Sequence, residues 1–332
     1  MQSSPNTIRQ RVLVLGASGF IGKRLVSALT SSDWAVPIAA GFRAMPSGFG
    51  EAAALRIDAR DVTALRIALS EADCVVNCVA GDAATIIASA RALFTAAASC
   101  SPAPRVINLS TMMVYGCAQG TVDEQAPLPG DYDGYSAAKA EVERLSRQYR
   151  NVVHLRPGIV YGPGSWLWSG RIGEWLEAQR LGDLGSAGLG YCNLVHVDDV
   201  AQAVLVALRL PGIEGEAFNL SLPTPPTWNE YFRLYAAALG ADFVSISRLR
   251  LKAELYVFAP PLKLMEMLSG ALHLRRRVPH PIRPWLLRLC AHSLRMDVTK
   301  AERVLSMQWT VLDEGLRQSS MWLHAAAETS NR

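Results

Sequence analysis

A short apolar run followed at once by three evenly spaced glycines restricts the fold of this chain more than any other feature. Residues 11–15 form a strand-like run, and Gly16, Gly19 and Gly22 open a helical segment directly after it. The first glycine permits a tight turn, the second lets the backbone approach a pyrophosphate, and the third allows close packing of helix on strand. Free N–H groups and the positive end of the helix dipole then hold the anion. The turn therefore predicts a βαβ unit that binds a dinucleotide.

The pattern continues beyond this first unit. Strands are predicted at 35–40, 74–80 and 105–109, with helices at 62–71 and 83–98. Such near-continuous hydrophobic strands indicate a parallel sheet covered by helices on both faces. We predict an α/β fold, a doubly wound parallel Rossmann sheet with a smaller C-terminal substrate lobe.

The length of 332 residues suits about two domains. We assign residues 8–160 to the dinucleotide-binding core, with returns of the chain at about 191–222. Residues 161–330 are assigned mainly to the substrate lobe, built from several excursions, and its last piece, 298–327, has an amphipathic helical pattern.

Composition excludes several classes of protein. The net charge of +4 is too even to indicate nucleic-acid binding, and no stretch is long and apolar enough to span a membrane. The six cysteines are scattered and form no Cys-x-x-Cys pair, so we expect reduced thiols, a cytoplasmic protein and no metal site.

The choice of dinucleotide depends on the end of the second strand. An acidic residue there would bind the ribose hydroxyls, whereas a basic residue would accommodate a 2′-phosphate. Asp33 precedes the strand and Arg43 follows it, and a guanidinium binds phosphate bidentately. We therefore expect NADP(H) in preference to NAD(H). Asp58, after a third apolar strand at 55–57, is a candidate partner of the adenine amino group.

Tyr135 and Lys139 lie four residues apart at the start of a strongly helical segment, so both side chains share one face. A free phenol has a pKa of about 10, too high for efficient proton exchange near neutral pH. A neighbouring ammonium favours phenolate and lowers that pKa. Tyr135 is therefore a candidate acid/base.

An ordered set of motifs resembles the extended short-chain dehydrogenase/reductase family, the NAD(P)-dependent epimerase/dehydratase group. The set comprises the glycine turn, Asp58, 77–81, Ser110-Thr111 before 114–116, Tyr135-x-x-x-Lys139, 156–162 and 195–200. The resemblance covers roughly residues 10–220 and implies an enzyme that transfers hydride between a nicotinamide and a carbon bearing oxygen.

The resemblance also implies roles for individual residues. Tyr135 would be the acid/base, Lys139 would lower its pKa and bind the nicotinamide ribose, and Thr111 would hydrogen-bond the reacting oxygen. It implies a homodimer through the helices that include Tyr135 and Ala90. The expected cofactor-binding residues are Gly16, Ser18, Gly19, Phe20, Ile21, Gly22, Arg43, Asp58, Ala80, Gly81, Tyr135, Lys139 and Pro157.

Departures from the family pattern bear on the substrate. Nucleotide-sugar enzymes of the family commonly carry Asn where this chain has Ile159, and Arg where it has Cys192. Arg171 or Arg180 could compensate for these losses. We expect a ketone or secondary alcohol on a relatively apolar substrate; a nucleotide-sugar epimerase or dehydratase and a non-catalytic cofactor-binding scaffold or redox sensor remain open as alternatives.

Two further features belong to the substrate half. Trp166, Trp168 and Trp175, with Met112 and Met113, are candidates for the cleft wall or for the core. The basic segment 275–295 is a candidate for weak contact with an anionic membrane surface, or for a lid with solvated arginines.

Overall fold

A seven-stranded parallel sheet forms one half of the molecule in the computed structural model, which describes residues 9–41, 52–258, 261–262, 265 and 280–330. Its strand order is β10-β7-β5-β4-β1-β2-β3, and every pairing is parallel. Two further parallel pairs are β11 with β6 and β8 with β9. The strands are β1 (Gln10–Leu15), β2 (Ala35–Gly41), β3 (Ala53–Arg56), β4 (Cys74–Asn77), β5 (Arg105–Leu109), β6 (Gly120–Val122), β7 (Val152–Pro157), β8 (Ile159–Tyr161), β9 (Leu194–His196), β10 (Ala217–Leu220) and β11 (Leu294–Met296).

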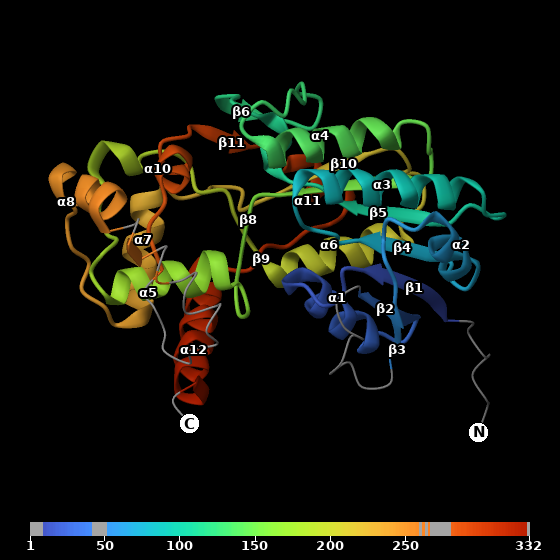
Figure 1. Cartoon of the computed structure of the whole chain (residues 1–332), viewed down its shortest axis with the longest axis horizontal. Coiled ribbons are helices and arrows are strands. Elements are labelled where there is room, and N and C mark those ends of the chain that lie inside the picture. The colour runs from blue at the N-terminus through green and yellow to red at the C-terminus, as the bar shows by residue number, and fades with distance from the viewer. Residues whose placement is uncertain (1–8, 42–51, 259–260, 263–264, 266–279, 331–332) are drawn as a thin grey trace.

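Helices cover both faces of the sheet and build the lobe beside it (Figure 1). They are α1 (Phe20–Thr30), α2 (Val62–Ser70), α3 (Ala83–Ala98), α4 (Gly134–Ser146), α5 (Arg171–Glu177), α6 (Val197–Arg209), α7 (Trp228–Leu239), α8 (Arg248–Ala253), α10 (Pro284–Cys290), α11 (Thr299–Val304) and α12 (Leu312–Ser330), with short 3₁₀ or π turns η1 (Met112–Tyr115), η2 (Trp166–Gly170), η3 (Gly185–Gly188) and η4 (Glu254–Phe258).

Successive side chains of each strand point to opposite faces of the sheet, and this explains the three layers of helix, sheet and helix. On β1, Val12 and Val14 pack in the core under α1 and α6, whereas Leu13 and Leu15 pack in the opposite core under α2, α3 and α4. All four side chains are buried, and burying each contributes about 1.5–3 kcal/mol. The predicted doubly wound parallel fold is confirmed.

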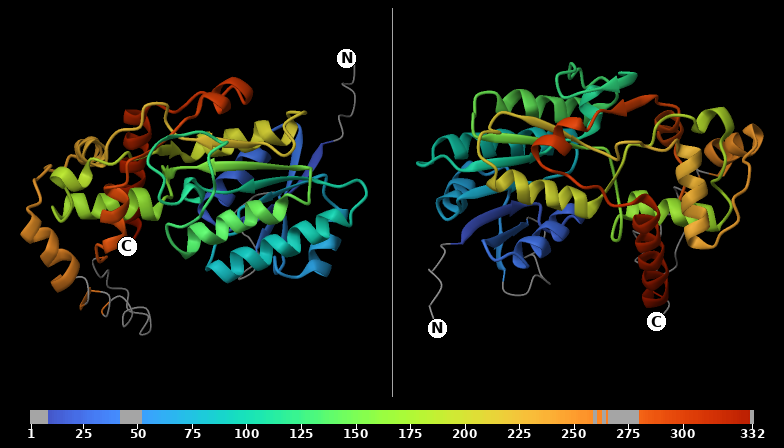
Figure 2. Two further views of the ribbon diagram at one scale, coloured as in Figure 1. Left: turned by 90° about the horizontal axis from the view of Figure 1, so that it is seen from above. Right: turned by 180° about the vertical axis from the view of Figure 1, so that it is seen from behind.

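The lobe has its own core, built around the aromatic residues of α7. Trp228, Tyr231, Phe232 and Tyr235 are fully buried there and pack with residues of α5 and α12. Both views in Figure 2 place this lobe beside the sheet rather than over one of its faces. The division into a core of 8–160, with returns near 191–222, and a lobe of 161–330 remains our proposal.

The C-terminal helical pattern forms two helices instead of one. The chain leaves α11 at Val304, Ser306 has a φ of 52°, and α12 starts at Leu312. The interruption keeps Leu305 and Met307 buried in the core under the sheet, which a continuous helix would not do for both. Burial of two apolar side chains thus overrides the local helical periodicity.

We expect the folded protein to lose stability as the pH falls below about 6.5, because buried His154 must remain neutral. Its Nδ1 accepts from the Asn108 side chain at 3.0 Å, and its Nε2 contacts the Ser146 hydroxyl at 2.8 Å. Burial lowers the pKa of His154 below its ordinary 6.5. Between the two pKa values the unfolded chain binds the extra proton, so unfolding becomes easier with acid.

Urea unfolding at pH of about 7.5 and about 5.5 measures this effect. His154→Gln should show a shallower pH dependence than the parent over that interval. A slope that is the same in both proteins would contradict the assignment.

Candidate active site

The predicted site residues meet at the carboxyl ends of four adjacent strands. The glycine turn follows β1, Ala80 and Gly81 follow β4, Thr111 follows β5, and Pro157 ends β7. These strands are neighbours in the order β7-β5-β4-β1, and the strand order reverses at β1. Ligands of open α/β sheets bind at such a reversal.

The glycine turn fits a dinucleotide. Gly16 has a φ of +79°, and a Cβ there would lie 2.7 Å from the Cys78 carbonyl oxygen; a Cβ at Gly22 would lie 2.3 Å from the Gly16 oxygen. Gly19 caps α1 without any side-chain hydrogen bond, and no acid stands in the first turn. The leading N–H groups of α1 are therefore available to a phosphate.

Thr111, Tyr135 and Lys139 line one cleft. Thr111 caps η1, its Oγ1 accepting from the Met113 N–H at 3.3 Å. Tyr135 is the second residue of α4 and is 39% exposed, while Lys139 is buried one turn further on. The structure thus brings the three predicted catalytic residues together.

The Lys139 ammonium is held by the backbone and lies near the Tyr135 ring. Its Nζ donates to the Leu109 carbonyl oxygen at 2.8 Å and lies 6.0 Å from the centre of the Tyr135 ring. Desolvation raises the pKa of Tyr135, a hydrogen bond with Thr111 opposes the rise, and Asp133 adds to it. The phenol pKa is therefore raised, and its lowering by the Lys139 ammonium remains a prediction.

Burial also changes the pKa of Lys139. Desolvation lowers its pKa to about 8, with Cys78 and Glu143 opposing the shift. At neutral pH the ammonium still holds its proton for most of the time, so the helix presents a buried cation beside the cleft.

A buried ion pair lies behind the catalytic residues, and sequence reasoning missed it. Arg156 Nη2 donates to Glu143 Oε2 at 2.6 Å, and both side chains are 5% exposed. Glu143 also accepts from the Ser110 hydroxyl at 2.5 Å, and Arg156 donates to the Tyr115 hydroxyl at 2.9 Å. Glu143 stands one helical turn beyond Lys139, so the pair ties α4 to β5 and β7 directly beneath the site.

The remaining cofactor candidates are distributed around the cleft. Phe20, Ile21, Ala80 and Pro157 line it, as does Val79. Ser18 is exposed in the glycine turn, and Gly81 follows β4, but neither contributes to the cleft wall.

Asp58 and Arg43 are the two residues expected at the adenosine end of the dinucleotide. The Asp58 carboxylate accepts from Arg60 Nη2 at 2.7 Å, and this hydrogen bond lowers the pKa of Asp58. The adenine contact remains a prediction. Arg43 lies outside the described residues.

The cleft has a volume of about 590 Å³ and largely apolar walls. Met112 and Met113 line one side, and Trp166, Leu167 and Trp168 of η2 another. α10, within the basic segment that the sequence offered as a lid, closes it with Trp285 and Leu289. Trp285 meets Trp168 edge-on, with ring centres 5.8 Å apart.

Trp175 takes the other role that the sequence left open. It is buried in the lobe core and does not line the cleft. Its indole N–H donates to the His280 carbonyl oxygen at 2.8 Å.

At the two positions where the chain departs from the family pattern, the side chains present no polar group to the cleft. Ile159 lies in the cleft wall at 3% exposure, and Cys192 is fully buried in the lobe core. Arg180 is engaged with Glu254 at 2.7 Å, and neither it nor Arg171 lines the cleft. Among the described lining residues, the charged side chains are Asp133 and Lys139.

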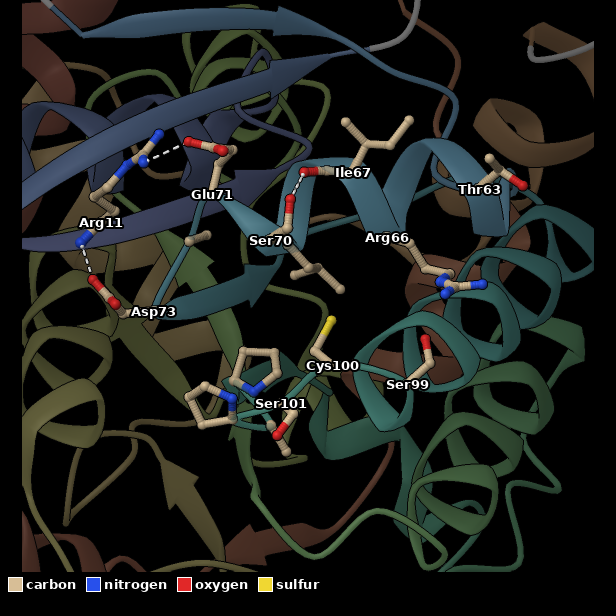
Figure 3. Close-up of a pocket in the computed structure, with 15 residues that line it drawn as sticks. Arg11, Thr63, Arg66, Ile67, Ser70, Glu71, Asp73, Ser99, Cys100 and Ser101 are labelled. Atoms are coloured by element: carbon tan, nitrogen blue, oxygen red, sulfur yellow. Dashed lines mark hydrogen bonds and ion pairs between the residues drawn. The ribbon is translucent and has the colours of Figure 1, made fainter.

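A larger cavity, about 730 Å³, lies at the opposite edge of the sheet (Figure 3). It is framed by the start of β1 and by the loops that lead into β4 and β5, and none of the predicted site residues lines it. We therefore place the candidate active site in the smaller cleft.

The described residues contain neither a metal-type cluster nor a membrane-spanning helix. No group of three or more His, Cys, Asp or Glu side chains gathers there as a metal site. Over the same residues, each helix is too short or too polar to cross a bilayer.

The chain is similar in sequence to known proteins. The family model described as NAD dependent epimerase/dehydratase family matches residues 12–221. The 2'-dehydrokanamycin reductase of Streptomyces kanamyceticus is 28% identical over 251 residues, which cover 71% of this chain and 69% of that protein.

Solved structures share the fold. MoeE5 in complex with UDP-glucuronic acid and NAD superposes with a TM-score of 0.71 at 22% identity, covering 95% of this chain and 99% of that one. UDP-glucuronic acid 4-epimerase from Bacillus cereus gives 0.70 at 20% identity, covering 95% and 99%. The family model matches well over half of the chain, and the resemblance noted in the sequence is confirmed. This chain belongs to the NAD dependent epimerase/dehydratase family and is an enzyme of the extended short-chain dehydrogenase/reductase type.

Proposed function

We propose that this enzyme interconverts a ketone and a secondary alcohol on a relatively apolar small molecule, with a nicotinamide dinucleotide as hydride carrier. The observation that carries the proposal is the cleft itself. It has Thr111, Tyr135 and Lys139 on its wall, and most of its other lining residues are aliphatic, aromatic or methionine side chains, with Asp133 as the remaining charged one among the described residues. Such walls favour apolar substrate surface and give a diphosphate no arginine partner among the described residues.

The chain's own residues supply the proton chemistry. When bound, the nicotinamide supplies or accepts the hydride. In the direction of reduction, the Tyr135 hydroxyl donates its proton to the substrate oxygen as the C–O bond becomes single, leaving a phenolate. Thr111 holds that oxygen by a hydrogen bond, and the Lys139 ammonium stabilises the phenolate and holds the ribose.

The similarity to a protein named as a reductase supports this direction of chemistry. We do not assign the substrate of that reductase to this chain. The identity is only 28%, and the chain departs from the family pattern at Ile159 and Cys192, on the substrate side.

A nucleotide-sugar epimerase or dehydratase is the second candidate, because the structural neighbours include enzymes solved with UDP-sugars. Calorimetric titration with UDP and dTDP separates the two. Our proposal expects no saturable binding of either nucleotide to the enzyme loaded with dinucleotide; binding in the micromolar range would favour the second candidate.

The reaction itself is tested with NADPH and NADH against a panel of apolar cyclic ketones, and with the oxidised cofactors against the matching secondary alcohols. Turnover of at least one pair, uninhibited by UDP, is the expected result. Turnover of sugar nucleotides alone would overturn the proposal.

We propose a preference for NADP(H), based on Arg43. No acid occurs in the sequence between Gly41, the last residue of β2, and Glu51. We expect Arg43→Ala to raise the KM for NADPH by about tenfold or more, since it removes a charge-assisted pair with phosphate, and to leave the KM for NADH nearly unchanged. Steady-state kinetics with both cofactors measure the ratio. An unchanged ratio would mean that another residue selects the cofactor.

We propose a cytoplasmic location, since all six cysteines are free thiols. We also propose a homodimer through α3 and α4, which pack side by side on one face of the sheet. Sedimentation analysis of the purified enzyme measures that state.

A further inference from the structure

The outer end of the lobe carries large apolar side chains on its outside. α8 and η4 form this end, and Figures 1 and 2 place α8 at the end of the molecule away from the sheet. Leu249 is 81% exposed, Tyr256 69% and Val257 62%, and Phe258 and Met265 are also more than half exposed. We call Leu249, Lys252 and residues 256–258 the outer surface.

The other side of the same segment is held to the lobe by an ion pair, a hydrogen bond and one apolar contact. Glu254 is buried and pairs with Arg180 at 2.7 Å. Arg250 donates to the Gln179 carbonyl oxygen, and Leu251 packs against the lobe core. These contacts fix which side faces outward, so the exposed apolar side chains do not result from free rotation of the segment. An ordinary surface helix keeps most of its large apolar side chains toward the core.

The charge of residues 248–258 indicates what kind of partner binds the outer surface. Residues 248–258 contain three cations and one acid, and that acid is Glu254, buried in its pair with Arg180. Lys252 is exposed among the apolar side chains. A second copy placed symmetrically on this surface would bring cation against cation, whereas an anionic bilayer complements the charge.

We propose that the outer surface docks on a bilayer containing anionic lipid. Leu249, Tyr256 and Phe258 enter the boundary between headgroups and acyl chains, and the Lys252 ammonium remains among the headgroups. Aromatic and aliphatic side chains beside lysine are the composition that binds this interface. The surface lies outside the cleft, so this docking does not depend on the proposed reaction.

Vesicle flotation of the whole enzyme tests the docking. The vesicles contain phosphatidylcholine with phosphatidylglycerol, or phosphatidylcholine alone. We expect partitioning into the anionic vesicles to exceed that into the neutral ones by about tenfold at low salt, and to fall as salt screens the charges. The double variant Leu249→Asp/Val257→Asp should lose about tenfold or more of the partitioning.

A matched double variant controls for charge and folding. Ile67→Asp/Val311→Asp changes the net charge by the same amount at side chains of similar exposure, 66% and 70%, and should partition like the parent. Circular dichroism melting verifies that both variants fold. Failure of the parent to partition, or equal losses in the two double variants, would overturn the proposal. So would a vesicle-free dimer that Leu249→Asp/Val257→Asp dissociates, since the occupant would then be a second copy.

Discussion

Tyr135→Phe is expected to lower kcat by about 10²–10⁴-fold while leaving the dissociation constant for the dinucleotide nearly unchanged. The substitution removes one oxygen from the cleft wall and keeps the ring, so it deletes the proton that the reaction exchanges. Thr111 and Lys139 remain in place, because Thr111 is held by the Met113 N–H and Lys139 by the Leu109 carbonyl oxygen.

Single-turnover kinetics and fluorescence titration of the cofactor measure the two quantities separately. Tyr191→Phe is the matched control, because Tyr191 is 38% exposed, close to Tyr135, and does not line the cleft. It should retain parental turnover. If Tyr135→Phe also retained it, the proton would come from another group and the proposed mechanism would fail.

The pH profile follows from the direction of the Tyr135 shift. Because desolvation raises the phenol pKa, the free enzyme holds the proton needed for reduction throughout the neutral range. Oxidation needs the phenolate, so its rate is expected to rise with pH. An oxidation rate independent of pH would contradict this assignment.

Arg156→Met is expected to lower the free energy of unfolding by about 3–5 kcal/mol, because it leaves the buried Glu143 carboxylate without its cation. The carboxylate would keep the Ser110 hydroxyl as a donor, but one hydrogen bond does not replace a bidentate guanidinium. Urea denaturation measures the difference.

Two further variants separate burial from charge. Arg11→Met removes an exposed arginine whose pair with Glu71 is drawn in Figure 3, and it should cost at most about 1 kcal/mol. Glu143→Leu/Arg156→Met removes both buried charges and should recover much of the loss. A cost for Arg156→Met no larger than that for Arg11→Met would show that the buried pair contributes little.

The local parts of the site could be predicted from the sequence. The turn at Gly16 follows from the strand that precedes it, since a side chain there would meet the Cys78 backbone. Tyr135 and Lys139 share a face because helical spacing requires it. The location of Thr111 at the end of a buried strand placed it at the same edge of the sheet.

Contacts between distant segments could not be predicted in this way. Trp285 reaches the cleft from α10, more than 100 residues after Trp168, and no local sequence pattern predicts the contact between the two rings. The partner of the Lys139 ammonium is a carbonyl oxygen on β5, and the pKa of Tyr135 is raised by the desolvation that tertiary packing produces.

The sequence by itself determined the parallel sheet, the glycine turn and the catalytic spacing, because each depends on hydrophobic periodicity or backbone sterics within a few residues. Only the tertiary structure decided the apolar walls of the cleft, the ion pair of Glu143 with Arg156 beneath it, and the outward side of α8. Burial, desolvation and charge pairing depend on which distant segments pack together, and that information appears only once the chain has folded.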